Sequence, residues 1–140
     1  KGWCSCQKCY KVFGQTGAES SAEMRTFMKS VIRVFLYDDD YNRFFGEGPC
    51  RLLHAIEETG SLRAAAASMN MAYTKAFSMI KRAEKSLAFP LTETITGGRG
   101  GGGSRLTPQA KEFVENYEKY RNACYEANIR IYNEIFLGGT

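Results

Sequence analysis

The apolar positions of this chain follow a helical period over four stretches. Phe77 shares a face with Ile80 in the third stretch, so we expect it to pack into the core. From residue 113 onward, apolar or small side chains recur at alternating spacings of four and three, which is a heptad pattern. The predicted helices cover residues 49–59, 61–69, 73–87 and 108–136.

Two pairs of short strands are predicted around these helices. Residues 31–37 (VIRVFLY) are rich in branched and aromatic side chains, and residues 43–45 can pair back to them across a turn of three aspartates. A second hairpin follows the third helix. Its strands cover residues 91–96 and 104–107, and the glycine-rich residues 97–103 join them.

Local signals divide the middle of the chain into two short helices. Gly60 can take the left-handed conformation that ends a helix, and Ser61 can cap the next one by accepting a backbone hydrogen bond. Ala64–Ala67 add almost no bulk, so another helix can cross closely. Asn70 tolerates the left-handed turn that would stop this helix. Two helices joined by a tight turn, the second polar and cationic, suit insertion into a DNA major groove.

The order of the elements predicts the fold class. We expect a mainly α protein with a small β component: a winged helix-turn-helix three-helix bundle with a β-hairpin wing and a long C-terminal helix. With 140 residues, 44% of them hydrophobic, the chain can bury one core. The expected parts are a cysteine-bearing extension at residues 1–28, a winged helix-turn-helix DNA-binding domain at residues 29–107, and a dimerisation helix at residues 108–140.

The positive charge is concentrated in the same region. Residues 61–107 carry seven basic and two acidic side chains, an excess of five, whereas the other segments carry 12 basic and 13 acidic ones. Cationic side chains neutralise phosphates and release counterions, which supplies affinity for DNA of any sequence. We therefore expect this region to face DNA.

The DNA-binding residues that we predict are polar or cationic side chains of the helix-turn-helix and the hairpin. Those in the first turns of helix 73–87 are expected at base edges, and those farther along at phosphates, with a solvated helix face as the alternative. The two arginines of the hairpin can reach phosphates or a minor groove. A hairpin without a partner is the alternative there, whereas a nucleotide-binding loop would end in Gly-Lys-Ser/Thr. The predicted set is Ser61, Arg63, Tyr73, Thr74, Lys75, Ser78, Lys81, Arg82, Lys85, Arg99 and Arg105.

Two stretches carry a resemblance to a known family. GSLRAAAASMNMAYTKAF and TGGRGGGGSRLTPQAKEF resemble the N-terminal DNA-binding domain of the molybdate-responsive ModE family of transcriptional regulators, a LysR-like winged helix. The resemblance extends from about Val31 to Tyr120, and the TGG-[KR]-GGGG wing is its specific part. It implies that residues 73–87 are the recognition helix. The family usually has Ser and Trp where this chain has Ala72 and Phe77.

The last predicted helix is longer than one small domain needs. At 1.5 Å per residue it would be roughly 43 Å long. We expect it to pair between two chains and to place two recognition helices about 34 Å apart, one turn of DNA. The alternative is a helix that folds back on its own chain, but the equivalent region of the resembling family helps to form a dimer. The expected seam is Phe113, Tyr117, Tyr120, Cys124, Ala127 and Ile131.

Other chemistry is sparse. The first 21 residues show little periodicity, and we expect irregular structure there. Their three cysteines could bind zinc if Cys50, His54 or Cys124 supplied a fourth ligand. A disulfide is a second possibility, but we favour an inert extension and expect no metal and no cofactor. His54 lacks a nucleophile motif beside it, so we expect a helix-surface role and no enzyme. The three cysteines are Cys4, Cys6 and Cys9.

Together these patterns predict a sequence-specific transcriptional regulator that binds double-stranded DNA as a homodimer. No apolar run approaches 18 residues and no secretory signal is present, so we expect a cytoplasmic protein. The first alternative is a winged-helix module that binds another protein without reading DNA. The second is a metal-sensing regulator that uses the N-terminal cysteines.

Overall fold

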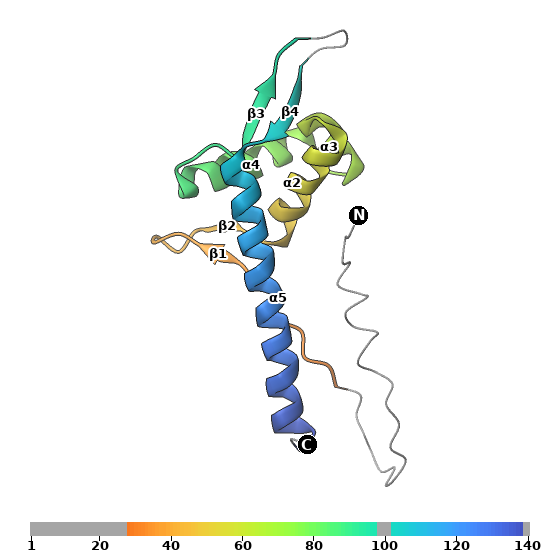
Figure 1. The fold of residues 1–140 in the computed structure, drawn as a ribbon, viewed down its shortest axis with the longest axis vertical. Coiled ribbons are helices and arrows are strands. Elements are labelled where there is room, and N and C mark those ends of the chain that lie inside the picture. The colour runs from red at the N-terminus through yellow and green to blue at the C-terminus, as the bar shows by residue number, and fades with distance from the viewer. Residues whose placement is uncertain (1–27, 98–101, 139–140) are drawn as a thin grey trace.

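A computed structural model describes residues 28–97 and 102–138 of the chain. Figure 1 shows a bundle of helices at one end of a long helix, with a hairpin projecting beyond the bundle. The predicted fold class, a winged helix-turn-helix with a long C-terminal helix, is confirmed. The elements are β1 (Leu36–Tyr37), β2 (Arg43–Phe45), α2 (Glu47–Thr59), α3 (Leu62–Ser68), α4 (Tyr73–Leu87), β3 (Thr92–Ile95), β4 (Gly103–Leu106) and α5 (Pro108–Phe136).

The core lies where α2 meets the other helices and the base of the hairpin. Leu52, Leu53 and Ile56 of α2 are fully buried, and burying each such side chain contributes about 1.5–3 kcal/mol. Phe45 closes one end of this core, because its ring makes T-shaped contacts with Phe113 and Tyr117 at centroid distances of 4.8 and 4.9 Å. The other buried apolar residues are Cys50, Ala55, Ala65, Ala66, Ala76, Ile80, Ala83, Leu91, Leu106, Ala110, Val114 and Tyr117.

The predicted turn signals are confirmed. Gly60 has a φ of 76° and its N–H donates to the carbonyl oxygen of Ile56 at 2.8 Å, which ends α2. The Ser61 hydroxyl then accepts a hydrogen bond from the N–H of Ala64 at 3.0 Å and caps α3. Asn70 takes a φ of 52° between α3 and α4. These few residues fix the angle at which α4 follows α3.

The hairpin is anchored to the bundle at its base. β3 and β4 pair antiparallel from Thr92 opposite Leu106 to Ile95 opposite Gly103. The Thr107 hydroxyl donates to the carbonyl oxygen of Pro90 at 2.7 Å and accepts from the N–H of Ala110 at 3.1 Å. One side chain therefore closes the hairpin and caps α5.

The predicted strand at residues 31–37 is wrong for most of its length. Only Leu36–Tyr37 pair with β2, while residues 28–35 run beside α5 without forming a strand (Figure 1). The Tyr117 hydroxyl donates to the carbonyl oxygen of Val34 at 2.9 Å, and the Tyr132 hydroxyl donates to that of Met28 at 3.0 Å. The branched side chains favour an extended backbone, but a helix is the neighbour here and it offers no ladder of backbone partners.

The second half of α5 extends away from the bundle. Its buried residues, Ala110, Val114 and Tyr117, all lie in the first half. The expected seam is therefore divided: Tyr117 packs in the core of its own chain, whereas Tyr120 and Ile131 are 57% and 48% exposed. None of the described helices is at once long and apolar enough to cross a membrane.

Candidate nucleic-acid interface

The surface of α4 is divided between a buried face and a polar one. Ala76, Ile80 and Ala83 are buried against the bundle. Side chains that lie on the opposite side, at about 100° per residue, are exposed to solvent. All the positions that we predicted on this helix belong to the exposed set: Tyr73, Thr74, Lys75, Ser78, Lys81, Arg82 and Lys85.

Three cations of this face are not engaged by acidic side chains nearby. Lys75, Arg82 and Lys85 make no ion pair with any residue of the described part of the chain. Lys81 differs, because its Nζ lies 2.8 Å from Oε2 of Glu84. The three unpaired cations give the face a net positive charge that is available to phosphates.

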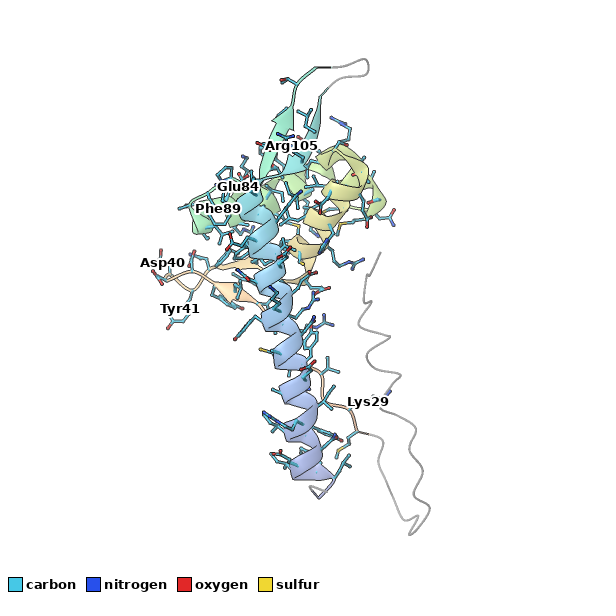
Figure 2. All side chains as sticks on the ribbon, in the orientation of Figure 1. Lys29, Asp40, Tyr41, Glu84, Phe89 and Arg105 are labelled. Carbon is cyan, nitrogen blue, oxygen red and sulfur yellow. The ribbon has the colours of Figure 1, made fainter. Side chains whose placement is uncertain are left out.

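Glu84 joins the end of α4 to the start of the hairpin (Figure 2). Its carboxylate accepts hydrogen bonds from Lys81 Nζ at 2.8 Å and from the backbone N–H of Leu91 at 2.9 Å. Partial burial alone would raise the pKa of this carboxyl, but the two hydrogen bonds hold it below its usual range. An ionised Glu84 therefore fixes the hairpin relative to α4.

Phe77 corrects the sequence prediction, because it is 43% exposed and does not belong to the core. The core face of α4 is centred between Ala76 and Ile80, and Phe77 lies on its flank. Its ring stacks on Tyr73 at a centroid distance of 6.2 Å. The Arg63 guanidinium lies 5.2 Å from the centre of the Tyr73 ring, and Lys81 Nζ lies 5.5 Å from that of Phe77.

These four side chains form a row, which we call the aromatic row: Arg63, Tyr73, Phe77 and Lys81. A cation over the face of an aromatic ring is attracted to the negative charge of that face, by about 0.5–1 kcal/mol at an exposed site. The row therefore links α3 to α4 on the exposed side of the helix-turn-helix, and it holds Arg63 beside the start of α4.

The first turn of α4 lacks a side-chain cap. Ala72 has the extended backbone of an N-cap residue, yet its methyl group accepts no hydrogen bond. The Ser61 hydroxyl, by contrast, is engaged as the cap of α3. Orphan N–H groups at the start of a helix can bind anions such as phosphate.

Of the two predicted wing arginines, the structure describes one. Arg99 lies outside the described residues. Arg105 is exposed on β4 (Figure 2), as its label shows. Its Nε lies 2.6 Å from Oε1 of Glu93 on β3. This ion pair crosses the hairpin between residues that are directly opposite in register. A phosphate would have to compete with Glu93 for this guanidinium.

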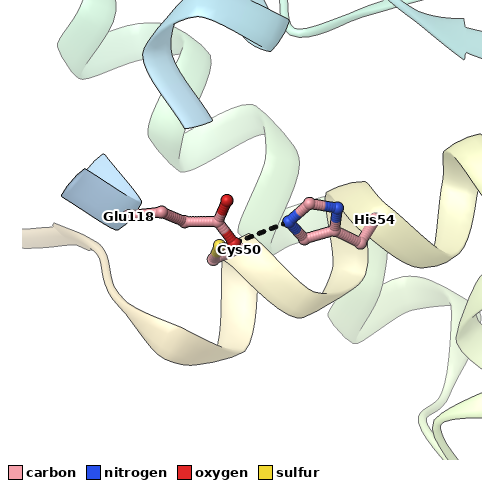
Figure 3. A group of neighbouring side chains, drawn as sticks. All are labelled: Cys50, His54 and Glu118. Carbon is pink, nitrogen blue, oxygen red and sulfur yellow. Dashed lines mark hydrogen bonds and ion pairs between the residues drawn. The ribbon is translucent and has the colours of Figure 1, made fainter. Parts of the chain in front are cut away.

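A second cluster joins α2 to α5 (Figure 3). His54 Nε2 lies 2.8 Å from Oε1 of Glu118, and Cys50 Sγ lies 3.7 Å from the same oxygen. Burial, and then the negative charge of Glu118, raises the pKa of the Cys50 thiol to about 12. From the sequence we named Cys50 and His54 as distant ligands for the N-terminal cysteines, which lie outside the described residues, and otherwise expected His54 on the helix surface. Glu118 was not predicted. The available signal was the i, i+4 spacing of Cys50 and His54 in a predicted helix.

Residues 50–111 match the family of bacterial regulatory helix-turn-helix proteins of the lysR type. This range begins within α2, includes the aromatic row and the hairpin, and ends in the first turn of α5. The match therefore covers the elements that build the candidate interface.

Similar proteins point the same way. A molybdenum transport protein ModE of Herbaspirillum seropedicae is 43% identical over 72 residues, 51% of this chain and 25% of that protein. A protein of the same name from Azotobacter vinelandii is 31% identical over 105 residues, 72% of this chain and 38% of that protein. The transcriptional regulator ModE of Haemophilus influenzae is 35% identical over 68 residues, 49% of this chain and 27% of that protein. The chain thus spans well under half the length of these relatives, and within that span it carries the helix-turn-helix domain of the ModE family, a DNA-binding domain of the lysR regulatory type.

Proposed function

We propose that this chain is a transcriptional regulator that binds double-stranded DNA with α4 in the major groove. The observation that carries the proposal is the division of α4 into a face buried in its own chain and an exposed face with three cations unpaired by described residues. A helix anchored along one side can insert its other side into a groove without unfolding the bundle.

The proposed contacts follow from position along α4. Tyr73, Thr74, Lys75 and Ser78 lie in the first turns and would meet base edges. The cations farther along would bind phosphates, which position the protein without reading sequence. The residues proposed for phosphate contacts are Lys81, Arg82 and Lys85 on α4, Ser61 and Arg63 at the start of α3, and Arg99 and Arg105 in the wing.

The aromatic row gives this interface a preorganised edge. Arg63 and Lys81 lie against rings, so less side-chain freedom is lost when they meet phosphates. Phe77 is exposed at the position where the resembling family usually has Trp. We assign it an apolar contact with the groove, such as the methyl group of thymine.

The protein acts as a dimer in this proposal, and α5 supplies the contact. Tyr120 and Ile131 are exposed on the part of the helix that extends from the bundle, at the spacing of a helix-helix seam. Pairing along this seam would bury them and repeat the recognition helix by two-fold symmetry. A palindromic operator is the expected partner.

The test is a fluorescence-anisotropy titration with duplexes from promoters of molybdenum transport genes, because two relatives are named for that process. Affinity should fall steeply as salt rises, and Lys75→Ala should weaken binding by about 1–3 kcal/mol if Lys75 contacts a base. Lys119→Ala is the matched control, because Lys119 is exposed on α5, away from α4. Salt-independent binding, or equal effects of the two variants, would contradict the proposal.

A further inference from the structure

We propose that Cys50, His54 and Glu118 form a binding site for a divalent transition metal, with Zn²⁺ as the best match, which joins α2 to α5. The site is separate from the exposed face of α4. It also differs from the zinc site considered for the N-terminal cysteines, because it needs none of them.

The geometry is that of a site with three ligands. Cys50 and His54 are four residues apart in α2, so they lie on one face of this helix, and Glu118 reaches them from α5 (Figure 3). One ligand atom from each residue lies within 4.8 Å of those of the other two. Tetrahedral zinc with bonds of 2.0–2.3 Å separates its ligand atoms by roughly 3.3–3.6 Å. The contacts of 2.8 and 3.7 Å to Glu118 Oε1 bracket this range, so small side-chain rotations suffice.

The chemistry of the ligand atoms selects the metal. A thiolate, an imidazole and a carboxylate are the three ligand types of zinc, whereas Ca²⁺ and Mg²⁺ prefer oxygen alone. Three protein ligands leave a fourth position for water. Arg121 is a competing cation, but its Nη1 lies 2.8 Å from Oε2 of Glu47, and its Nη2 is 3.9 Å from Glu118 Oε1. Glu47 therefore offsets the charge that would repel the ion.

Binding releases one proton to solvent, the proton of the Cys50 thiol. His54 coordinates through Nε2 as a neutral ring with its proton on Nδ1, so the hydrogen bond between His54 and Glu118 is replaced by one bond from each residue to the metal. Access is open, because the side chains of His54 and Glu118 are 31% and 32% exposed although Cys50 is buried. Affinity should therefore rise with pH. The other charged groups at the site are Glu47 and Arg121.

The ion would fasten the bundle to the helix that extends from it. α2 belongs to the core, whereas α5 carries the exposed seam, and the site lies between them. A ligand that binds only the folded chain raises its thermal midpoint. Zinc should therefore raise the melting temperature of the whole chain, in the absence of DNA.

The test uses Co²⁺ as a spectroscopic probe for Zn²⁺ with the full chain. The parent should bind one Co²⁺ at this site and show a thiolate-to-cobalt charge-transfer absorption that Zn²⁺ displaces. A chain with Cys4, Cys6 and Cys9 all replaced by Ser should keep this absorption, as should Cys124→Ser, the matched control. Cys50→Ser should lose it. Glu118→Gln, at a partly exposed position, should weaken the affinity for Zn²⁺ by more than about 100-fold. A residue that only hydrogen-bonds to a metal ligand contributes about 10- to 100-fold.

The outcomes separate this proposal from its competitors. Loss of the absorption in the triple Ser chain, or its survival in Cys50→Ser, would overturn the site. Circular dichroism shows whether Cys50→Ser is folded; if it is not, Glu118→Gln and His54→Gln decide by the same zinc titration. DNA titrations with chelator present report on the proposed function independently, so either proposal can fail alone.

Discussion

The backbone N–H of Ser104 donates a hydrogen bond to the carbonyl oxygen of Gly60 at 2.7 Å and ties the wing to the turn between α2 and α3. The neighbouring Gly103 is part of the same contact. A Cβ atom at residue 103 would lie 2.5 Å from the Gly60 oxygen, which is backbone and cannot rotate away. The last glycine of the wing is thus required by close packing.

Gly103→Ala should therefore destabilise the chain by about 1–3 kcal/mol, the usual cost of overpacking. Urea denaturation measures the loss. Gly48→Ala is the control, because a Cβ there meets only the end of the Met79 side chain, at 3.4 Å; replacing a helical glycine by alanine should stabilise by about 0.5–1 kcal/mol. A neutral Gly103→Ala would mean that the wing is not held at this point.

Phe77 and Ile80 should respond differently to truncation. Ile80 is 2% exposed, so Ile80→Ala should cost about 2–5 kcal/mol of stability. Phe77→Ala should cost about 1 kcal/mol, because it removes the ring contact with Tyr73 and the cation–π contact with Lys81, and it should lower DNA affinity. Denaturation and anisotropy on the two variants distinguish the roles. If Phe77→Ala lost as much stability as Ile80→Ala, Phe77 would belong to the core after all.

Ala72→Ser should stabilise the chain. Ala72 already has the extended backbone of an N-cap residue, and it lacks only the oxygen that would accept a hydrogen bond from the first turn of α4. Such a cap contributes about 0.5–2 kcal/mol. Thermal denaturation should show a higher midpoint for Ala72→Ser than for the parent and for Ala72→Val, which adds bulk but has no acceptor. Equal midpoints would show that the first turn is satisfied by water alone.

Ile131→Glu should weaken self-association, because it places a charge in the proposed seam of α5. Ile129→Glu is the matched control on the same helix: two residues correspond to about 200° of rotation, so its side chain lies on another flank. Sedimentation across a concentration series measures the effect, and binding to a palindromic duplex should weaken in parallel. Two variants that both match the parent would remove α5 from the dimer interface.

The free energy of unfolding should fall as pH rises into the alkaline range. Burial raises the pKa of the Cys50 thiol to about 12 and also raises that of the Tyr117 hydroxyl. The folded chain therefore keeps protons that the unfolded chain releases from about pH 9 upward. This stability is fully present below pH 9 and is lost as pH rises toward 12, by at most about 1.4 kcal/mol per pH unit for each group. Urea titrations with chelator give the free energy of unfolding at each pH. Its fall with rising pH should be less steep for Cys50→Ser than for the parent, and an unchanged slope would contradict the role of Cys50.

The helix-turn-helix could be predicted closely because its signals are local. Gly60, Ser61 and Asn70 each do what their own chemistry favours, within a few residues of the helix ends that they define. The limits of α4 follow in the same way. The fold class could therefore be predicted from neighbours in sequence.

The errors concern partners that are distant in sequence. The pattern of residues 31–37 indicates an extended chain, but it does not predict that this segment packs beside Tyr117 of α5. Periodicity places Phe77 near Ile80 but does not give the width of the buried face. Glu118 is 64 residues from His54, and no spacing rule joins two such positions.

The segment from Met28 to Val34 also limits how two copies can meet. It occupies the side of α5 that carries Tyr132, so a second copy that pairs along this helix must approach from the side of Ile131. In the proposed dimer, the side of α5 from which the second copy approaches would set the angle between the two bundles, and with it the number of base pairs between the two halves of an operator.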